Sequence, residues 1–451
     1  MKYCEYDNKL TIEDANDVEV FDCNLIPKEE LKDYTHLRFR DCKILKTIIN
    51  IPNQITNLSF VGCKSLESIP EHIPLIELNI DYCSKYIEIP NTLINLKNLH
   101  LDHIYHLKTL PKEFINLEDL YLAKIEDLEE IPKEYTKLKS LYIYDSQILT
   151  EIPEYPELED LYVNYCEKLS KLPEKIYNLK ELIVRDIEIE ELPKTYSNLQ
   201  RLSIDGNFKI KIIPTEYKNL IKLSLSNSNL EQLPEIKNLK KLYLFDMYKI
   251  RNIPDYYQNL KTLYMFHVNI KGLPFLKNIE KITINECKFI KTIPKNLSKL
   301  RYLSCYQCTK LKYIPTEFNL KDLTVGECYL ISKIPGSLKK LEKLDIFCNN
   351  RIKFIPSLNN LKDLSISSCP NITKIPSSLN KIEKLLIYEN EKINSVPNLY
   401  NLKDLTILYC PKVIQLPYTF NNLEKLYLID SAKIKNIPSN YIKFLDPRSR
   451  I

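Results

Sequence analysis

The stretch Leu361-Lys-Asp-Leu-Ser-Ile-Ser-Ser-Cys-Pro-Asn-Ile-Thr-Lys-Ile-Pro376 contains the pattern that decides the fold of this chain. Apolar and polar residues alternate from Leu364 to Ile366, which is the period of a β-strand with one buried face. Related phrases return about every 20 residues from Val18 to Leu428. A fixed period of this length predicts coils that stack on one another, because a single coil cannot bury its own apolar face.

Two apolar positions, separated by one residue, mark the strand of each coil. Strands repeated at a constant spacing are expected to lie parallel and side by side, with these two positions buried. We therefore predict one parallel sheet of about 21 strands, whose other face is open and concave. The 21 pairs are Val18/Val20, Leu37/Phe39, Leu58/Phe60, Leu78/Ile80, Leu99/Leu101, Leu120/Leu122, Leu141/Ile143, Leu161/Val163, Leu182/Val184, Leu202/Ile204, Leu223/Leu225, Leu242/Leu244, Leu263/Met265, Ile282/Ile284, Leu303/Cys305, Leu323/Val325, Leu344/Ile346, Leu364/Ile366, Leu385/Ile387, Leu405/Ile407 and Leu426/Leu428.

Each strand is followed by a return segment that usually contains Ile-Pro or Leu-Pro, as at Ile89-Pro90 and Leu416-Pro417. Proline fixes φ and donates no hydrogen bond, which suits an extended or turn segment and not the interior of a helix. A coil of about 20 residues also has little length left for a helix. We predict mostly extended or 3₁₀ segments on the convex side and few true helices. The predicted domains are an N-terminal cap over 1–17, the repeats over 18–438 and a C-terminal cap or tail over 439–451.

The composition excludes several classes of protein. Of the 451 residues, 44% are hydrophobic, and the net charge is only +5 with no long block of either sign. Because evenly mixed charge gives no strong field, we expect no nucleic-acid partner. No run of 18 apolar residues occurs, so no membrane span is expected. The segment from Met1 to Asn16 is acidic and lacks an apolar core, so we expect no signal peptide. We therefore expect an intracellular, cytoplasmic protein whose cysteines are reduced.

The repeated phrase Leu-x-x-Leu-x-Ile-x-x-Cys-x-x-Leu-x-x-Ile-Pro makes the chain resemble the leucine-rich repeat family, in its short Leu/Ile-Pro form. The resemblance covers about nine-tenths of the chain. Because Lys, Asn, Ile and Tyr are abundant, the chain looks most like leucine-rich repeat proteins of large DNA viruses of amoebae, or of protists. The resemblance implies an α/β-type leucine-rich repeat solenoid that binds a protein partner on its concave sheet. If the protein is viral, we expect it in the host cytoplasm.

The function that the resemblance implies is a non-enzymatic scaffold for protein–protein interaction, without a cofactor. An alternative is a substrate-recognition subunit that recruits a ubiquitin ligase or a signalling enzyme of a host. The stretch from Ile26 to Leu31 faintly resembles the opening of an F-box, although it is also the ordinary return segment of the first coil.

Most cysteines occupy one place in the repeat, five residues after the first strand position. In the leucine-rich repeat family this place holds Asn or Cys, whose side chain turns inward and bonds the backbone at the bend. Asn207, Asn349 and Asn390 fill it in three coils of this chain. We therefore predict a buried structural ladder, and inward positions for Cys305 and Cys308 in place of a redox pair. Ten of the 13 cysteines form the ladder: Cys23, Cys42, Cys63, Cys83, Cys166, Cys287, Cys308, Cys328, Cys369 and Cys410.

His100, Asp102 and His103 lie close together in the sequence and have side chains of the types that bind metals. The same residue types also occur in ordinary polar patches on a sheet. Because one weak match of this kind is more often solvated than ligating, we predict no metal site and no cofactor. No sequence signature gathers Ser, His and Asp into a triad, so we predict no catalytic residue. A metal-dependent or redox enzyme is a further alternative.

Aromatic residues flank the buried strand positions in two clusters on the expected concave face. Large rings are common at binding hot spots, although aromatic residues also favour strands for packing reasons alone. Acidic residues recur at the strand exits, where they suit a basic and apolar partner and repel phosphate: Asp41, Asp145, Asp186, Asp246, Glu286, Glu327, Glu389 and Asp430. We predict that the two clusters bind the partner; they are Tyr121, Tyr142, Tyr144, Tyr162 and Tyr165, and Tyr243, Phe245, Tyr264 and Phe266.

Opposite charges alternate at one strand position in the last third of the chain. On neighbouring strands they are expected to lie side by side, which is favourable by a few tenths to about 1 kcal/mol per pair. We interpret them as a solvated structural ladder of Asp322, Lys343, Asp363, Lys384, Asp404 and Lys425.

Overall fold

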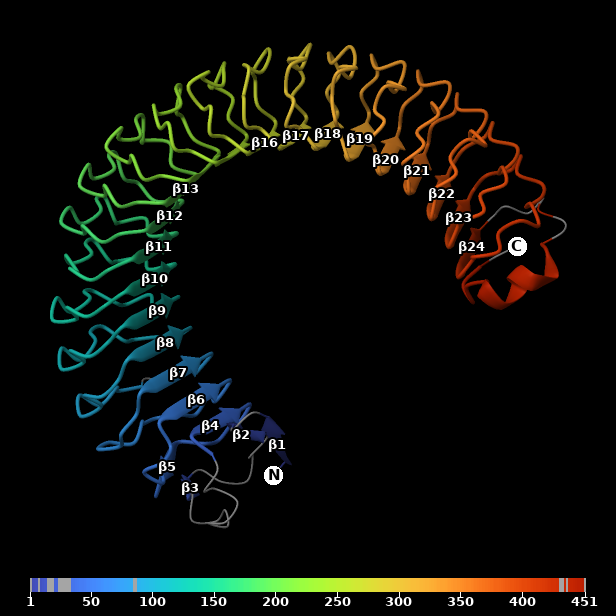
Figure 1. Ribbon diagram of the computed structural model, residues 1–451. Coiled ribbons are helices and arrows are strands. Elements are labelled where there is room, and N and C mark those ends of the chain that lie inside the picture. Colours follow the sequence, from blue (N-terminus) through green and yellow to red (C-terminus); the bar gives the residue numbers. More distant parts are fainter. Residues whose placement is uncertain are drawn as a thin grey trace. The chain divides into compact units, whose positions relative to one another are not determined.

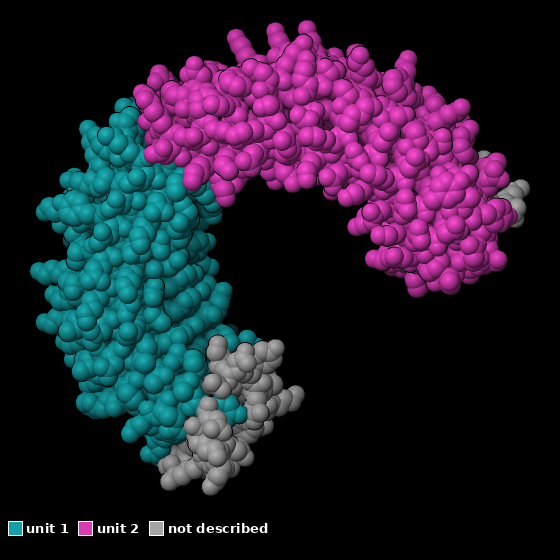
Figure 2. Space-filling model, in the orientation of Figure 1, with its two compact units in different colours: residues 1–230 teal, residues 231–451 magenta. Residues whose placement is uncertain are grey.

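The computed structural model describes residues 34–83, 87–429, 434 and 437–449, and the backbone of three strands among the first 33 residues. The chain divides into two compact units, Met1–Leu230 and Glu231–Ile451, which are coloured separately in Figure 2. Each unit is a stack of coils, and each coil contributes a short strand and a return segment. Within each unit the strands line the inner, concave side of the stack (Figure 1).

Unit 1 contains a parallel sheet in which β2, β4 and β6–β14 pair in chain order. Strand β1 adds to β2 in the antiparallel sense, and β3 and β5 form a separate parallel pair. The strands are β1 (Lys2–Tyr6), β2 (Lys9–Glu13), β3 (Val20–Asp22), β4 (His36–Arg40), β5 (Thr47–Ile49), β6 (Asn57–Val61), β7 (Glu77–Asp81), β8 (Asn98–Asp102), β9 (Asp119–Ala123), β10 (Ser140–Tyr144), β11 (Asp160–Asn164), β12 (Glu181–Arg185), β13 (Arg201–Asp205) and β14 (Lys222–Ser226).

Unit 2 repeats this arrangement with β15–β24, which also pair in parallel and in chain order. Its elements are β15 (Lys241–Phe245), β16 (Thr262–Phe266), β17 (Lys281–Asn285), β18 (Tyr302–Tyr306), β19 (Asp322–Gly326), β20 (Lys343–Phe347), β21 (Asp363–Ser367), β22 (Lys384–Tyr388), β23 (Asp404–Leu408), β24 (Lys425–Ile429) and the 3₁₀ helix η2 (Ser439–Phe444). The parallel sheets on the concave sides of the two units therefore have 11 and 10 described strands, 21 in all, and the described residues form almost no helix, which confirms the predicted fold class. None of its helices is long and apolar enough to cross a membrane.

The core follows directly from the strand alternation. In β21 the second and fourth residues, Leu364 and Ile366, are fully buried, while the residues between and beside them stay partly exposed. Leu364 pairs with Leu344 on one side and Leu385 on the other, so equivalent residues of successive coils stack into continuous apolar rows. Each coil is therefore covered by its neighbours, as the period predicts.

The first coil differs from the prediction. Leu10 and Ile12 of β2 pair with Leu37 and Phe39, so they occupy the strand positions assigned to Val18 and Val20. Val18 lies outside the described residues, and Val20 belongs to β3, which pairs with β5. Leu10-Thr-Ile12 shows the same alternation as the other strands. The prediction was wrong because it placed the first strand about 20 residues before Leu37, whereas the first coil is longer than that. The domain boundaries at 17 and 438 stay predictions, and the stretch from Ile26 to Leu31 lies outside the described residues.

The inward ladder at the bend is confirmed for all its members in the described residues, which exclude Cys23. Each of these cysteines is fully buried. The Cys369 thiol donates to the carbonyl of Ser367 at 3.3 Å and to that of Ile346, in the preceding coil, at 3.6 Å. Cys305 is fully buried as well. Burial raises the pKa of the Cys287 thiol to about 11, so this member of the ladder stays a neutral thiol at ordinary pH.

Buried tyrosines form a second row of cross-coil bonds, in the return segments. The Tyr257 hydroxyl donates to the carbonyl of Pro234 at 2.7 Å, and that of Tyr441 in η2 donates to Pro417 at 2.8 Å. The same bond to the proline of the preceding coil is made by Tyr135, Tyr155, Tyr196 and Tyr217.

The charge ladder has the predicted register, but its ion pairs lie elsewhere. Asp322, Lys343 and Asp363 stand opposite one another on β19, β20 and β21. Among the described residues, however, the ion pairs of this region join the preceding positions, as in Lys362–Glu342 at 3.4 Å and Lys403–Glu383 at 2.8 Å. These pairs are solvent-exposed and contribute little individually.

Cys348 is expected to be the fast-reacting thiol among the described cysteines, because it is exposed while the other ten are buried. In a variant with Cys4 and Cys23 replaced by serine, maleimide at pH 7.5 should label one thiol quickly and the remainder only after unfolding. Further replacement of Cys348 by serine should abolish the fast phase, as followed by intact-protein mass spectrometry. Rapid native labelling of Cys287 or Cys369 would contradict the buried ladder.

Candidate binding surface

Four rings form a row on the exposed face of the unit 1 sheet, here called the aromatic ladder, with a stacked pair at each end and a tilted contact between the two pairs. They are His100, Tyr121, Tyr142 and Tyr162, each at the middle position of its strand, on β8–β11. The ring centroids of His100 and Tyr121 lie 4.1 Å apart, those of Tyr121 and Tyr142 6.0 Å, and those of Tyr142 and Tyr162 4.1 Å. The sequence predicted the three tyrosines, whereas His100 was considered only as a metal ligand.

Tyr144 and Tyr165 extend the ladder toward the strand exits. Their rings meet edge to face at 5.4 Å, and the side chains are 37% and 39% exposed. All five tyrosines predicted for unit 1 therefore lie on one surface, and the more exposed pair offers its rings most freely to solvent.

Glu181 holds the far end of the ladder and was missed by the sequence analysis. The Tyr162 hydroxyl donates to Glu181 at 2.8 Å, and the Arg201 guanidinium donates to the same oxygen at 2.8 Å. Burial and the bond to Glu181 raise the pKa of Tyr162 well above its usual range. Burial alone would raise the pKa of the Glu181 carboxyl, but the bonds from Arg201 and Tyr162 outweigh it and lower this pKa. The ring of Tyr162 is therefore held in place before any partner arrives.

Carboxylates border the aromatic ladder on both sides. Asp119 and Asp160 take the first positions of β9 and β11, and Asp81 and Asp102 take the last positions of β7 and β8. Burial, together with Glu181, raises the pKa of Asp160. Burial, together with Asp102, raises the pKa of Asp81. Both carboxyls thus lie where an additional positive charge is favourable.

The three metal candidates are only partly brought together. His103 Nδ1 lies 2.6 Å from Asp102, and Asp81, which the sequence analysis did not consider, completes a group whose ligand atoms lie within 4.8 Å of one another. His100 stacks on Tyr121 instead. The Lys124 ammonium lies 3.1 Å from His103 Nε2, and its positive charge opposes a second cation there. The absence of a metal site stays a prediction.

The second predicted cluster lies on unit 2. Tyr243 and Tyr264 pair on β15 and β16, and so do Phe245 and Phe266. The contact between Phe245 and Tyr264 is 5.0 Å between ring centroids, and that between the two tyrosines is 6.3 Å. These four rings are less closely stacked than the aromatic ladder, so the ladder is the stronger candidate.

The acidic residues at the strand exits have a conformational role that the sequence analysis missed. Asp41, Asp145 and Glu327 have φ of 54°, 56° and 47°, in the left-handed region. The other predicted rim residues among those described also have positive φ, and Asp430 lies outside the described residues. Gly62 takes the same position with φ of 69°. Asp, Asn and Gly tolerate this region best, so the recurrent aspartates follow in part from the bend itself.

No protein-family model and no curated protein sequence matches the chain. Solved structures are similar to it. YopM from Yersinia enterocolitica WA-314 is 18% identical over 87% of this chain and 86% of its own, with a TM-score of 0.52. A leucine-rich repeat protein of Leptospira interrogans is 19% identical over 85% and 89%, with a TM-score of 0.44. InlJ from Listeria monocytogenes, whose structure includes a cysteine ladder, is 16% identical over 73% and 65%, with a TM-score of 0.44. The resemblance to viral or protist proteins stays a prediction. The likeness to YopM shows that this chain has the leucine-rich repeat fold.

Proposed function

We propose that the chain is a non-enzymatic scaffold that binds a protein partner on the exposed sheet face of unit 1, centred on the aromatic ladder. The observation that carries this proposal is the row of four rings on adjacent strands, in which two closely stacked pairs meet at a tilted contact between Tyr121 and Tyr142. Neighbouring rings restrict one another, and the sheet beneath them is already formed. Little conformational entropy is therefore lost when a partner covers them.

The chemistry of this surface indicates what the partner presents. Tyrosine rings offer large contact areas with few rotatable bonds and are common at hot spots. Asp81, Asp119 and Asp160 border the rings, and Arg201, which lies 3.7 Å from Asp160, bonds Glu181 more closely, at 2.8 Å. A partner segment with lysine or arginine among apolar residues fits this arrangement, through ion pairs at the edges and cation–π contacts over the rings.

Combined replacement of Tyr142 and Tyr162 by alanine is expected to weaken partner binding about 100-fold, because it removes the two most closely stacked tyrosines of the ladder. The partner is first identified by proximity labelling in the native cell, and its affinity is then measured with purified proteins. Tyr177→Ala, at a tyrosine that is 56% exposed on a return segment, is the matched control and should leave the affinity unchanged. Equal affinity of the double variant and the native protein would remove this surface from consideration.

A further inference from the structure

The return segments after β17–β21 carry basic residues and no acidic ones. Between the ladder position and the proline, these five segments span 287–294, 308–315, 328–335, 349–356 and 369–376. All their lysines and arginines are exposed. We call them the basic strip; it consists of Lys288, Lys291, Lys310, Lys312, Lys333, Arg351, Lys353 and Lys374.

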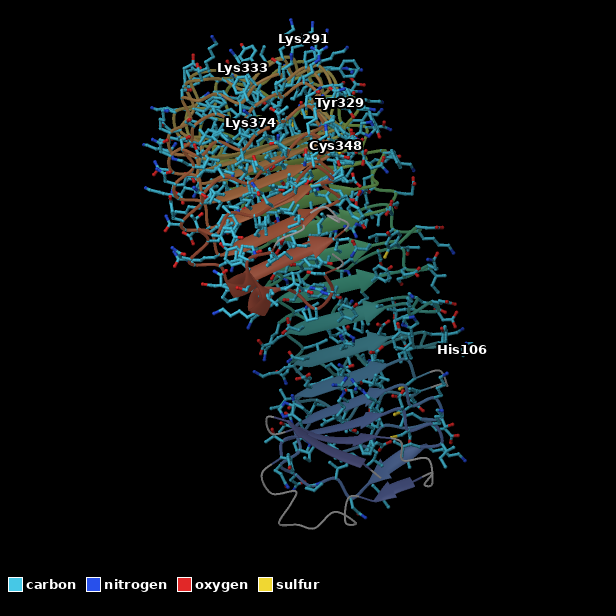
Figure 3. All side chains as sticks on the ribbon, turned by 90° about the vertical axis from the view of Figure 1, so that its right-hand side faces the viewer. His106, Lys291, Tyr329, Lys333, Cys348 and Lys374 are labelled. Atoms are coloured by element: carbon cyan, nitrogen blue, oxygen red, sulfur yellow. The ribbon has the colours of Figure 1, made fainter. Side chains whose placement is uncertain are left out.

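Cross-coil bonds place residues of successive segments beside one another. The backbone N–H of Lys312 donates to the carbonyl of Lys291 at 3.2 Å, and Lys291 donates in turn to Lys271 at 3.4 Å. The Asn371 side chain donates to the carbonyl of Asn350 at 2.6 Å. Figure 3 labels Lys291, Lys333 and Lys374 from alternate segments of the basic strip. The repeat thus arranges its cations in a row, one or two per coil.

The charge of the basic strip is not neutralised within the described residues. None of its members forms an ion pair there, and the Lys310 ammonium lies instead 4.8 Å from the centre of the Phe289 ring. The nearby bend residue Glu327 accepts hydrogen bonds from Gln307, Tyr306 and Tyr329, which are all neutral donors. The whole row is therefore available to an anionic ligand.

Equivalent segments of unit 1 show that the coil does not require these cations. The segment before Pro193 carries Glu188, Glu190 and Glu191, and Glu188 pairs with Lys209 of the next coil at 2.9 Å. The sequence analysis expected no nucleic-acid partner because positive and negative charges are evenly mixed along the chain. Residues at one coil position recur only about every 20 residues, so the linear sequence does not show that cations gather on these return segments.

Exposed rings lie among the cations. Phe289, Tyr313, Tyr329 and Phe354 belong to the same segments and are 41%, 37%, 41% and 59% exposed. Flat rings interleaved with a row of cations are the two elements with which proteins bind single-stranded nucleic acid, since bases stack on the rings while lysines follow the phosphates. An acidic protein surface would satisfy the lysines, whereas a single strand supplies both phosphates for the lysines and flat bases for the rings.

We propose that the basic strip binds single-stranded nucleic acid without strong sequence preference, with phosphates on the lysines and bases on Phe289, Tyr313 and Phe354. Lysine is a point-like phosphate contact, which suits binding that depends on the backbone and not on particular bases. The basic strip shares no residue with the aromatic ladder, so this inference and the proposed function are tested independently.

Binding is measured by fluorescence anisotropy of labelled 20-nucleotide single strands, RNA and DNA, with the full chain at several salt concentrations. The triple variant Lys291→Glu, Lys312→Glu and Lys333→Glu should bind at least about tenfold more weakly, and the slope of log affinity against log salt should fall by about 2. Its control is Lys168→Glu, Lys171→Glu and Lys211→Glu in unit 1, which changes the net charge equally and should bind as the native chain does.

A second variant separates stacking from charge. Combined replacement of Phe289 and Phe354 by alanine should weaken single-strand binding about tenfold while leaving the salt slope unchanged, because only base contacts are lost. Circular dichroism checks that each variant is folded. Three results would each overturn the proposal. They are equal losses of affinity in the two lysine triple variants, undetectable binding of both oligonucleotides, and binding to phosphatidylserine vesicles but not to oligonucleotides.

Discussion

Replacing Tyr257 with alanine is expected to lower the free energy of unfolding by about 3–5 kcal/mol, the range typical of a large aromatic core residue. The side chain is fully buried, and its hydroxyl bonds the Pro234 carbonyl of the preceding coil at 2.7 Å. Truncation therefore leaves a cavity between two coils and an unsatisfied carbonyl at the same time. Urea unfolding followed by circular dichroism measures the loss.

The phenylalanine variant of the same residue divides this effect into its two parts. Tyr257→Phe keeps the ring and removes only the donor, so a loss of about 1–3 kcal/mol is expected. Tyr418→Ala, at a tyrosine that is 73% exposed, is the control and should change stability by less than about 0.5 kcal/mol. A Tyr257→Ala variant as stable as the control would show that the coils do not depend on this row of tyrosines.

The protonation of the Tyr257 hydroxyl also makes the free energy of unfolding depend on pH. Burial raises the pKa of Tyr257 well above its usual range, so the folded state favours the protonated phenol. The resulting stability is present below the unfolded pKa, about 10, and is lost as the pH rises above it. The Phe variant should lose less stability between pH 9 and pH 11 than the native protein.

These tyrosines show how far the sequence predicts the structure. Most strand positions were predictable because the same alternation returns in every coil after the first, and the residue pair Leu364 and Ile366 needs no further information to be placed in the core. The tyrosine row was missed, although Pro193-Lys-Thr-Tyr196 and Pro214-Thr-Glu-Tyr217 repeat one spacing, because the same position holds Ile176 or Leu297 in other coils. Only the stacked coils reveal that the hydroxyl reaches a proline about 23 residues earlier.

The candidate site likewise has a part that the sequence predicts and a part that it does not. Tyr121, Tyr142 and Tyr162 were predictable as neighbours because each lies between the two buried positions of its strand, and these positions fix the register of the parallel strands. The bond from Tyr162 to Glu181 depends on side-chain rotamers, which a periodic pattern does not specify. The left-handed bend was likewise hidden, since its residues were interpreted as a charged rim and not as a backbone requirement.

Asn390→Ala is expected to destabilise unit 2 by about 3–5 kcal/mol, because it strips three partners from a fully buried site. The Asn390 amide donates to the carbonyls of Ile366 and Tyr388 at 2.9 and 2.8 Å and accepts from the Cys369 N–H at 3.1 Å. Alanine replaces none of these bonds, and water does not reach the site. Urea unfolding measures the loss, with the exposed Asn394→Ala as the control.

Cysteine should rescue most of this loss, because the ladder position accepts either residue. In the next coil the Cys410 thiol donates to the carbonyls of Leu408 and Ile387, at 3.2 and 3.6 Å, which are the equivalents of the two Asn390 acceptors. Asn390→Cys leaves only the Cys369 N–H without its partner and is expected to lose about 1–2 kcal/mol. If Asn390→Cys were as unstable as Asn390→Ala, the shared hydrogen bonds would not explain the alternation of Asn and Cys. The ladder would then be selected by the volume of the side chain alone.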